Sequence, residues 1–169
     1  AFSAPTQKLM RARISGRRTE HVIGYGQRHL LSELFEGAPD GVSITLKPAG
    51  HVLGSAMVLI EHDGKSVLYT GDFKLSPGLV SEVCEPCHAD ELIMETTFGR
   101  PKYILPPRDQ VVAQMLEFCR ESIRLGAVPI LLGYSLGKSQ ELLAAFTGTG
   151  IPVLLAGPAV KMKIGRAHV

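Results

Sequence analysis

Apolar and polar residues alternate along the first half of the chain. Between residues 41 and 94 the pattern repeats at every second position, as it does at Val42, Ile44 and Leu46. This period is typical of strands with one face buried and one face in water. A short apolar run at 92–94 predicts a further strand, and we expect it to be buried.

Two apolar runs, 56–61 and 66–70, flank the pair Asp63-Gly64. An Asp-Gly pair between apolar runs favours a two-residue hairpin, because the turn needs positive φ angles that glycine adopts easily. The sequence therefore predicts an antiparallel hairpin with its tip at residues 63–64.

The period changes after Pro101. Apolar residues then recur at steps of three and four up to Gly126, which predicts an amphipathic helix. Two apolar runs, 128–132 and 151–156, flank a second predicted helix at 139–146 and are expected to be buried strands. Strand, helix and strand in this order imply a parallel pair with a right-handed crossover.

Composition narrows the class of protein. The chain has 169 residues, of which 45% are hydrophobic and 20% charged, enough for one sizeable core and unlike a disordered chain. No apolar run approaches the roughly 20 residues of a membrane-spanning helix. Three cysteines are too few for a disulfide scaffold, so we expect a reducing, cytoplasmic environment without an export signal.

The net charge of +2 does not by itself indicate a nucleic-acid partner. Basic residues are nevertheless crowded between Lys8 and Arg18, on a helix that the sequence predicts to begin after Thr6. This stretch has two interpretations: a solvated helix face, or a surface that follows a nucleic-acid backbone.

His51 precedes the first strand of the hairpin, and Asp72 follows the second. Because antiparallel strands bring the start of one beside the end of the other, Asp72 should lie nearly opposite Ser55, with His51 at the same sheet edge. An imidazole and a carboxylate that converge there suit zinc or manganese. The alternative is a surface histidine beside a turn-capping aspartate.

Glu95 follows the predicted strand at 92–94. A carboxylate that leaves a sheet at this edge can orient a ligand histidine or a proton. An ordinary polar turn with Thr96 and Thr97 is the other interpretation.

Three segments carry a family resemblance: GHVLGSA at 50–56, YTGDF at 69–73 and METTFG at 94–99. In this order they resemble the third and fourth motifs of the metallo-β-lactamase fold, followed by motif A of the β-CASP nucleases. Smaller stretches, Arg11-Ala12-Arg13, Glu85-Pro86 and 134–142, are most similar to the bacterial branch of DNA-ligase-associated and RNA-processing exonucleases. The resemblance extends from Ser3 to about Met162.

The resemblance implies an α/β fold. Residues 1–99 would be part of an αββα metallo-β-lactamase domain, and residues 100–163 the first part of a Rossmann-like β-CASP cap. The hexapeptide 164–169 is expected to be translated sequencing-adapter sequence, which makes the chain an internal piece of a longer protein.

The resemblance also implies two divalent metal ions, zinc or alternatively manganese. His51 would be a metal ligand, Asp72 the catalytic carboxylate that bridges both ions, and Glu95 the motif A acid that orients other residues. The chain lacks the His-x-His-x-Asp-His cluster of such enzymes, so we expect it to be inactive alone.

Two further motifs have competing interpretations. The stretch 84–88 matches the C-x-x-C-H pattern of haem attachment, but a plain surface loop is favoured over haem or structural zinc. The stretch 133–139 resembles a Walker A loop with one residue too few. Ser135, Gly137 and Lys138 could still bind a nucleic-acid phosphate at a helix N-terminus, or a serine could simply cap the helix.

The expected function is that of a metal-dependent nuclease acting on DNA or RNA, with possible partners in a DNA ligase or the RNA-processing machinery and no membrane. The alternatives are a small-molecule metallo-hydrolase acting on a thioester or lactone, and a nucleic-acid-binding relative without catalysis.

Overall fold

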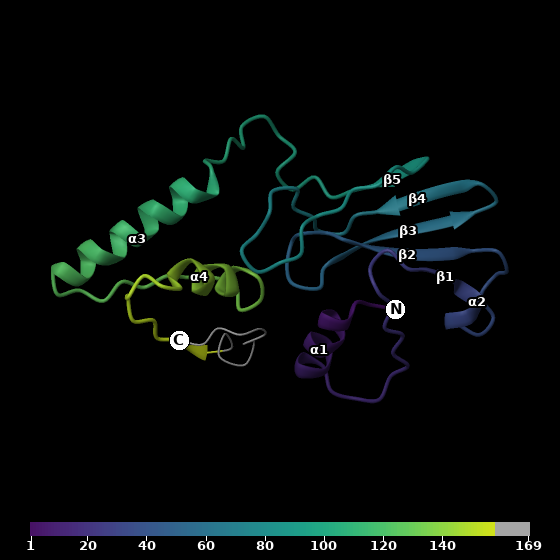
Figure 1. Cartoon of the computed structure of the whole chain (residues 1–169), viewed down its shortest axis with the longest axis horizontal. Helices are drawn as coiled ribbons and strands as arrows, with labels where there is room; N and C mark the ends of the chain where they lie inside the picture. Colours follow the sequence, from purple (N-terminus) through teal and green to yellow (C-terminus); the bar gives the residue numbers. More distant parts are fainter. Residues whose placement is uncertain (158–169) are drawn as a thin grey trace. The chain divides into compact units, whose positions relative to one another are not determined.

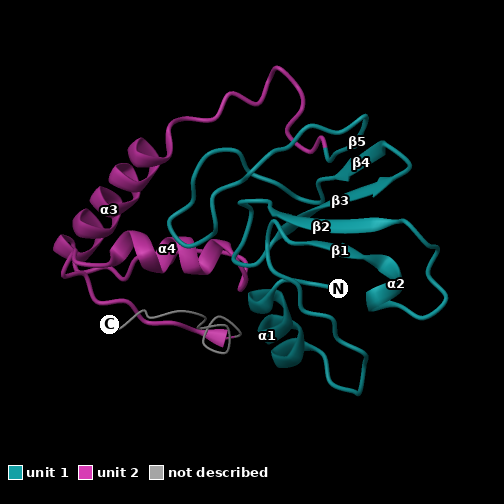
Figure 2. Ribbon diagram, turned by 45° about the vertical axis from the view of Figure 1, so that its right-hand side comes forward, with its two compact units in different colours: residues 1–95 teal, residues 96–169 magenta. Residues whose placement is uncertain are grey.

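The computed structural model of the chain describes residues 1–157 (Figure 1). It divides into two compact units, unit 1 (Ala1–Glu95) and unit 2 (Thr96–Val169), which are coloured separately in Figure 2. The tail at 164–169, expected to be adapter-encoded, lies outside the described residues. Among the described residues no helix combines the length and the apolar character needed to cross a bilayer.

Within residues 1–95, one five-stranded sheet lies beside two helices (Figure 1). Along the chain the elements are α1 (Ala4–Arg13), β1 (Arg28–Leu30), α2 (Leu31–Leu34), β2 (Ser43–Pro48), β3 (Ala56–His62), β4 (Lys65–Tyr69) and β5 (Glu91–Ile93). The strands follow one another across the sheet in chain order. All neighbours are antiparallel except β4 and β5, which are parallel.

The hairpin of β3 and β4 is confirmed, with its turn at the predicted place. Asp63 has φ 47° and Gly64 φ 72°, the two successive positive angles of a type I′ turn. Asp63 is the only non-glycine residue with positive φ among the described residues, and Asp tolerates this conformation better than most residues.

Helix α1 begins at Ala4, earlier than predicted. The Ser3 hydroxyl accepts a hydrogen bond from the Thr6 N–H at 3.3 Å, which is the ordinary N-cap contact. Pro5 fits in the first turn, where no N–H partner is needed. The cap and the proline together fix the start of the helix.

Apolar side chains are buried on both faces of the sheet. The clusters are Ala49, Met57, Leu68 and Cys84 on one face, and Ile23, Ile44 and Leu46 on the other. The expectation of half-buried strands is wrong for β2, where Ser43 is 0% and Thr45 5% exposed. The burial of both small hydroxyl side chains beneath a covering layer makes β2 a central strand with two dry faces.

The predicted strand at 92–94 exists as β5, but its expected burial is wrong. Leu92 and Ile93 are each 56% exposed. β5 pairs with β4 on one side and lies at the edge of the sheet, so an apolar run here does not mark the interior.

In unit 2 both predicted helices are confirmed as α3 (Arg108–Arg124) and α4 (Lys138–Phe146). The predicted strands at 128–132 and 151–156 are wrong: no strand occurs between residues 96 and 157, and Leu132 is 91% exposed. A strand needs a neighbour to pair with its N–H and C=O groups. The described part of unit 2 contains no such neighbour, and these apolar runs form no strand; the first is mostly exposed, and the second alternates between half-buried and exposed residues.

The chain is therefore a mixed α/β protein. The finer assignments, an αββα metallo-β-lactamase layer order and a Rossmann-like cap, stay predictions.

Candidate functional site

The structure brings His51 and Asp72 together. The register of β3 and β4 ends with the pair Val58 and Tyr69. Counting three residues beyond this last pair gives Ser55 as the counterpart of Asp72, and their pairing stays a prediction. His51 lies in the loop directly before β3. Its Nε2 atom is 3.8 Å from Asp72 Oδ2, and the two side chains are 46% and 73% exposed. The pair thus faces water at one edge of the sheet.

The loop that carries His51, residues 49–55, is held together by its own hydrogen bonds. The Ser55 hydroxyl accepts the N–H groups of His51 at 3.1 Å and Val52 at 3.2 Å. The Ala49 N–H donates to Ser55 O at 3.0 Å, so the two ends of the loop are closed by main-chain contact. A closed loop of this kind fixes the backbone from which the imidazole projects.

Segments distant in sequence hold the same loop from outside. The Gly50 carbonyl accepts the Ser81 hydroxyl at 3.0 Å, and the Gly54 N–H donates to the Glu82 carboxylate at 2.9 Å. The Tyr25 hydroxyl donates to Ser55 O at 3.1 Å. Burial of this phenol is the main reason that the pKa of Tyr25 is raised, which keeps it a hydrogen-bond donor.

Helix α1 supplies the closest of these external contacts. The Gly54 carbonyl accepts the hydroxyls of Ser3 at 2.7 Å and Thr6 at 2.8 Å. A Cβ atom built on Gly54 would lie 2.8 Å from the Thr6 nitrogen. The first turn of α1 therefore packs against the His51 loop at a point where only glycine fits.

Glu95 follows β5, and Asp72 follows β4. Because these two strands are parallel, both residues come after the same end of the strand pair. The Glu95 N–H lies 3.4 Å from the Thr70 hydroxyl, and the Thr70 N–H donates to Ile93 O at 3.0 Å. Thr70 thus couples the backbone that precedes Asp72 to the backbone that precedes Glu95. The orienting role expected for the Glu95 carboxylate stays a prediction.

The donor set of the described residues is too small for a metal centre. Two ligands that share a tetrahedral zinc ion lie roughly 3.4 Å apart when each bond is about 2.1 Å, so a pair at 3.8 Å is compatible with one cation. Within residues 1–157, however, no group of three or more His, Cys, Asp or Glu side chains could hold a metal. His51 and Asp72 fit as part of a site and do not fit as a complete one.

The C-x-x-C-H stretch forms a loop that leads to β5. The expectation of a surface turn is wrong for Cys84, which is 8% exposed and belongs to the core cluster with Met57 and Leu68. Burial raises the pKa of the Cys84 thiol, and the nearby Glu85 adds to the effect. Cys84 is thus a small apolar core residue rather than a ligand.

The polar groups of the loop before α4 form hydrogen bonds with one another and with Gln140 of the helix. The Gly137 N–H donates to the Gln140 side chain at 2.6 Å, and the N–H groups of Lys138 and Ser139 donate to Leu136 O and Tyr134 O. The Ser135 carbonyl accepts the Gln140 amide at 3.0 Å. The N-cap residue is therefore Gly137, whose N–H is bound by Gln140 of the first turn, and not a serine. Phosphate binding by Ser135, Gly137 and Lys138 stays a prediction that these contacts do not favour.

The contacts of Ser3, Thr6 and Glu82 with Gly54 were not predicted. The only local signal was the Ser-x-Pro start of a helix, which locates the cap and says nothing about its partner 48 to 51 residues away.

No protein-family model matches the chain. A protein named "Probable DNA ligase" from Opitutus terrae is 49% identical over 154 residues, which are 90% of this chain and 14% of that protein. An "RNase J-like protein" from Methanocaldococcus jannaschii is 39% identical over 97 residues, 56% of this chain and 23% of the relative. "Endoribonuclease ysh1" from Schizosaccharomyces pombe is 35% identical over 106 residues, 62% of this chain and 14% of the relative.

The chain is a relative of the β-CASP nucleases. It spans between 14% and 23% of the length of these three relatives. The second and third of these relatives are named for ribonucleases, and the first is named as a DNA ligase.

Proposed function

We propose that this chain is part of a metal-dependent nuclease that hydrolyses phosphodiester bonds in DNA or RNA. In the proposal, His51 and Asp72 are two of the ligands of a two-metal centre, with zinc preferred over manganese. Glu95 is the acid that orients neighbouring groups. The relative named as a DNA ligase supports a further proposal, that the nuclease works together with a ligase.

The single observation that carries the proposal is the pairing of His51 with Asp72. Two side chains that can bind a metal lie 3.8 Å apart, although 20 intervening residues separate them. Both are exposed to solvent, so a ligand can reach them. The His51 backbone is held by Ser55 within its loop and by Ser3 and Thr6 through Gly54. Such support is what a ligand position requires.

We also propose that residues outside this chain complete the site and that the 169-residue piece is inactive alone. Two donors are half of the four that zinc takes in a closed site. Metal-dependent cleavage of an oligonucleotide by the purified 169-residue chain would contradict this part of the proposal.

The test uses the longer protein that contains this chain. His51→Ala and Asp72→Ala should each lower cleavage of labelled single-stranded DNA or RNA by more than about 100-fold, since even the loss of an outer partner of a metal ligand costs 10–100-fold.

The hairpin supplies a matched control at its other end. His62 Nε2 and Asp63 Oδ2 are 3.4 Å apart, and both side chains are exposed. His62→Ala and Asp63→Asn therefore remove an imidazole and a negative charge from the same hairpin, and Asn tolerates the positive φ of this position. These controls should keep cleavage near that of the unaltered protein. Activity that survives both His51→Ala and Asp72→Ala removes the proposed ligand roles.

A nucleic-acid-binding relative without catalysis is the second proposal. It is favoured by one observation, that the described residues offer no third metal ligand. The same assay separates the two: a longer protein that binds oligonucleotides but never cleaves them supports the binding function.

A further inference from the structure

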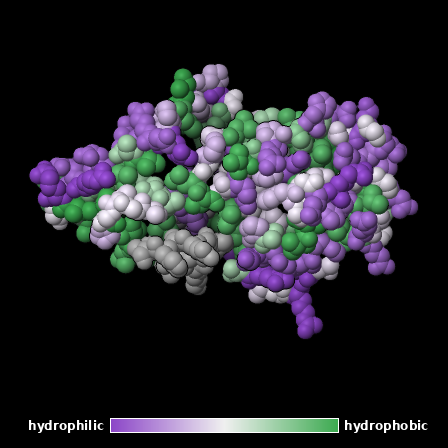
Figure 3. All heavy atoms as spheres, in the orientation of Figure 1, coloured by the Kyte–Doolittle hydropathy of each residue, from purple (hydrophilic) through white to green (hydrophobic). Residues whose placement is uncertain are grey.

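Positive charge is concentrated in one short segment of unit 1. Residues 8–20 carry five basic side chains and one acidic, a net charge of +4, while the other 13 basic and 15 acidic residues leave the rest of the chain at −2. The overall charge of +2 conceals this separation, which creates a local positive field. In Figure 3 the surface over α1 is mostly hydrophilic.

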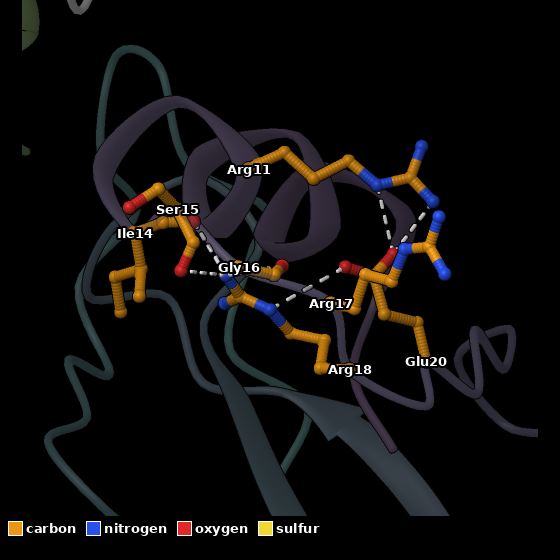
Figure 4. A pocket seen from close by; sticks show the side chains of 7 residues that line it. All are labelled: Arg11, Ile14, Ser15, Gly16, Arg17, Arg18 and Glu20. Carbon is orange, nitrogen blue, oxygen red and sulfur yellow. Dashed lines mark hydrogen bonds and ion pairs between the residues drawn. The ribbon is translucent and has the colours of Figure 1, made fainter.

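The same segment forms an open pocket of about 470 Å³. The pocket is lined by Arg11, Arg17 and Arg18, by Glu20 and by the turn at 14–16 (Figure 4). Three guanidinium groups against one carboxylate make it a positively charged hollow.

Arg18 and Glu20 build the pocket. The Arg18 guanidinium donates to the carbonyl of Ile14 and to those of Ser15 at 3.2 Å and Gly16 at 3.5 Å, which folds the turn around it. The Glu20 carboxylate accepts Arg11 Nε at 2.8 Å and the Gln7 amide at 2.7 Å.

Hydrogen bonds from Arg11, and then from Gln7, lower the pKa of Glu20, so the carboxylate is ionised at neutral pH. The carboxylate is hydrogen-bonded to Arg11 and lies 3.9 Å from Arg18 Nε (Figure 4). The single acid of the pocket is thereby engaged and repels an incoming anion less than a free carboxylate does.

Three of the cations remain available. Lys8, Arg13 and Arg17 are exposed and form no ion pair with any residue in the described range 1–157. Arg11, although paired, keeps 64% of its side chain exposed. Lys8 and Arg13 lie on α1, and Arg17 lies in the turn that follows the helix. Three unpaired cations within ten residues are suited to a polyanion.

We infer that this surface, which we call the α1 basic surface (Lys8, Arg11, Arg13, Arg17 and Arg18), binds the phosphodiester backbone of a nucleic acid. The inference rests on the proposed function for the choice of polyanion. Two of the three available cations, Arg13 and Arg17, are arginines, whose planar forks match two phosphate oxygens at once. The α1 basic surface would hold the strand, and the His51–Asp72 edge would lie farther along it.

The length of α1 sets the distance between the last-turn arginines of the α1 basic surface and the loop that carries His51. Ten residues at 1.5 Å per residue make a helix about 15 Å long. Its first turn binds Gly54, three residues from His51, and its last turn carries Arg11 and Arg13. At about 3.4 Å of helix axis per base pair of B-form DNA, the length of α1 corresponds to about four base pairs.

The test measures binding of the 169-residue chain to a fluorescently labelled 12-nucleotide DNA or RNA by anisotropy between 50 and 200 mM salt. Arg13→Ala and Arg17→Ala should each weaken binding about fivefold at 0.1 M salt and lower the salt slope by about 0.7, the share of one phosphate contact to a single strand. Arg17→Lys should keep the slope.

Arg120→Ala is the matched control. Arg120 is an exposed arginine of α3 without an ion pair in the described part of the chain, and its loss should change neither affinity nor slope. Far-UV circular dichroism checks that every variant is folded. Equal binding by Arg17→Ala, Arg13→Ala and Arg120→Ala overturns the inference, as does a polyglutamate of equal charge that competes as well as the oligonucleotide.

Failure of the inference and failure of the proposed nuclease are distinguishable. Binding that depends on Arg13 and Arg17, together with a longer protein that never cleaves, supports the α1 basic surface and removes the nuclease. Cleavage that depends on His51 and Asp72, with a substrate KM that Arg17→Ala leaves unchanged, supports the nuclease and removes the α1 basic surface.

Discussion

The contact between α1 and the His51 loop leads to a quantitative prediction at Gly54. This residue has φ 85°, and an added Cβ atom would lie 2.8 Å from the Thr6 nitrogen and 2.9 Å from Pro5 Cβ. The obstructing atoms belong to the backbone and to a rigid ring, so they cannot rotate away. Gly54→Ala must therefore shift either the loop or the first turn of α1.

The cost has two parts. A left-handed backbone costs a non-glycine residue about 1–2 kcal/mol. Moving α1 away breaks the hydrogen bonds from Ser3 and Thr6 to the Gly54 carbonyl, each of which contributes about 1 kcal/mol. Gly54→Ala should thus lower the free energy of unfolding by about 3–4 kcal/mol.

The measurement is urea unfolding followed by far-UV circular dichroism, with Gly37→Ala as the matched control. Gly37 has φ 75° and no atom within 4 Å of an added Cβ, so its substitution carries the backbone cost alone. The two variants should differ by about 2 kcal/mol. A Gly54→Ala variant that loses no more stability than Gly37→Ala would show that α1 does not hold the loop.

Three other features of the described residues make predictions. Cys84 and Cys119 are buried and Cys87 is half-buried, so iodoacetamide should modify one thiol in the native chain and three in urea, as counted by intact mass. The raised pKa of Cys84 means that the native state keeps its thiol proton longer than the unfolded state; the unfolding free energy should fall as pH rises above the ordinary value of 9.0, and this fall should be smaller in Cys84→Ala, where only the raised pKa of Tyr25 still contributes. The Ser66 hydroxyl and N–H each lie 2.8 Å from the Asp90 carboxylate and lower its pKa; Asp90→Asn should therefore lose stability at neutral pH, and its difference from the unaltered chain should vanish as pH falls below 3.8, in urea titrations at several pH values. Ile130 and Leu132 are 77% and 91% exposed, so replacing both with Ser should leave the urea midpoint unchanged and raise the concentration at which the chain precipitates.

Local chemistry explains why the hairpin and the His51–Asp72 pair could be predicted. An Asp63-Gly64 turn fixes the strand register, since a two-residue connection leaves no freedom to slip. Once the register is fixed, the neighbour of each residue on the opposite strand follows by counting, even beyond the strand ends. By this count Ser55 is the counterpart of Asp72, which predicts that His51 and Asp72 approach each other, as they do at 3.8 Å.

Long-range pairing explains why the strands of unit 2 could not be predicted in the same way. The runs 128–132 and 151–156 have the composition of strands, but composition does not supply a neighbour with free N–H and C=O groups. The same limit applies to the burial of β5 and of Ser43, because the layer that covers a face comes from elsewhere in the chain. It applies also to the contact of Ser3 with Gly54.

Helix α1 links the two proposals, because its first turn touches the His51 loop and its last turn carries two residues of the α1 basic surface, Arg11 and Arg13. If Gly54 sets the position of the whole helix, Gly54→Ala should weaken oligonucleotide binding as well as stability. Arg17→Ala should weaken binding alone, because Arg17 is exposed and forms no ion pair in the described range. The oligonucleotide affinity of both variants is measured at 0.1 M salt, at a temperature where the variants are folded. Unchanged affinity in Gly54→Ala would instead show that Leu9, which is 6% exposed, and the Arg11–Glu20 ion pair at 2.6 Å position the basic end of α1 without help from the loop.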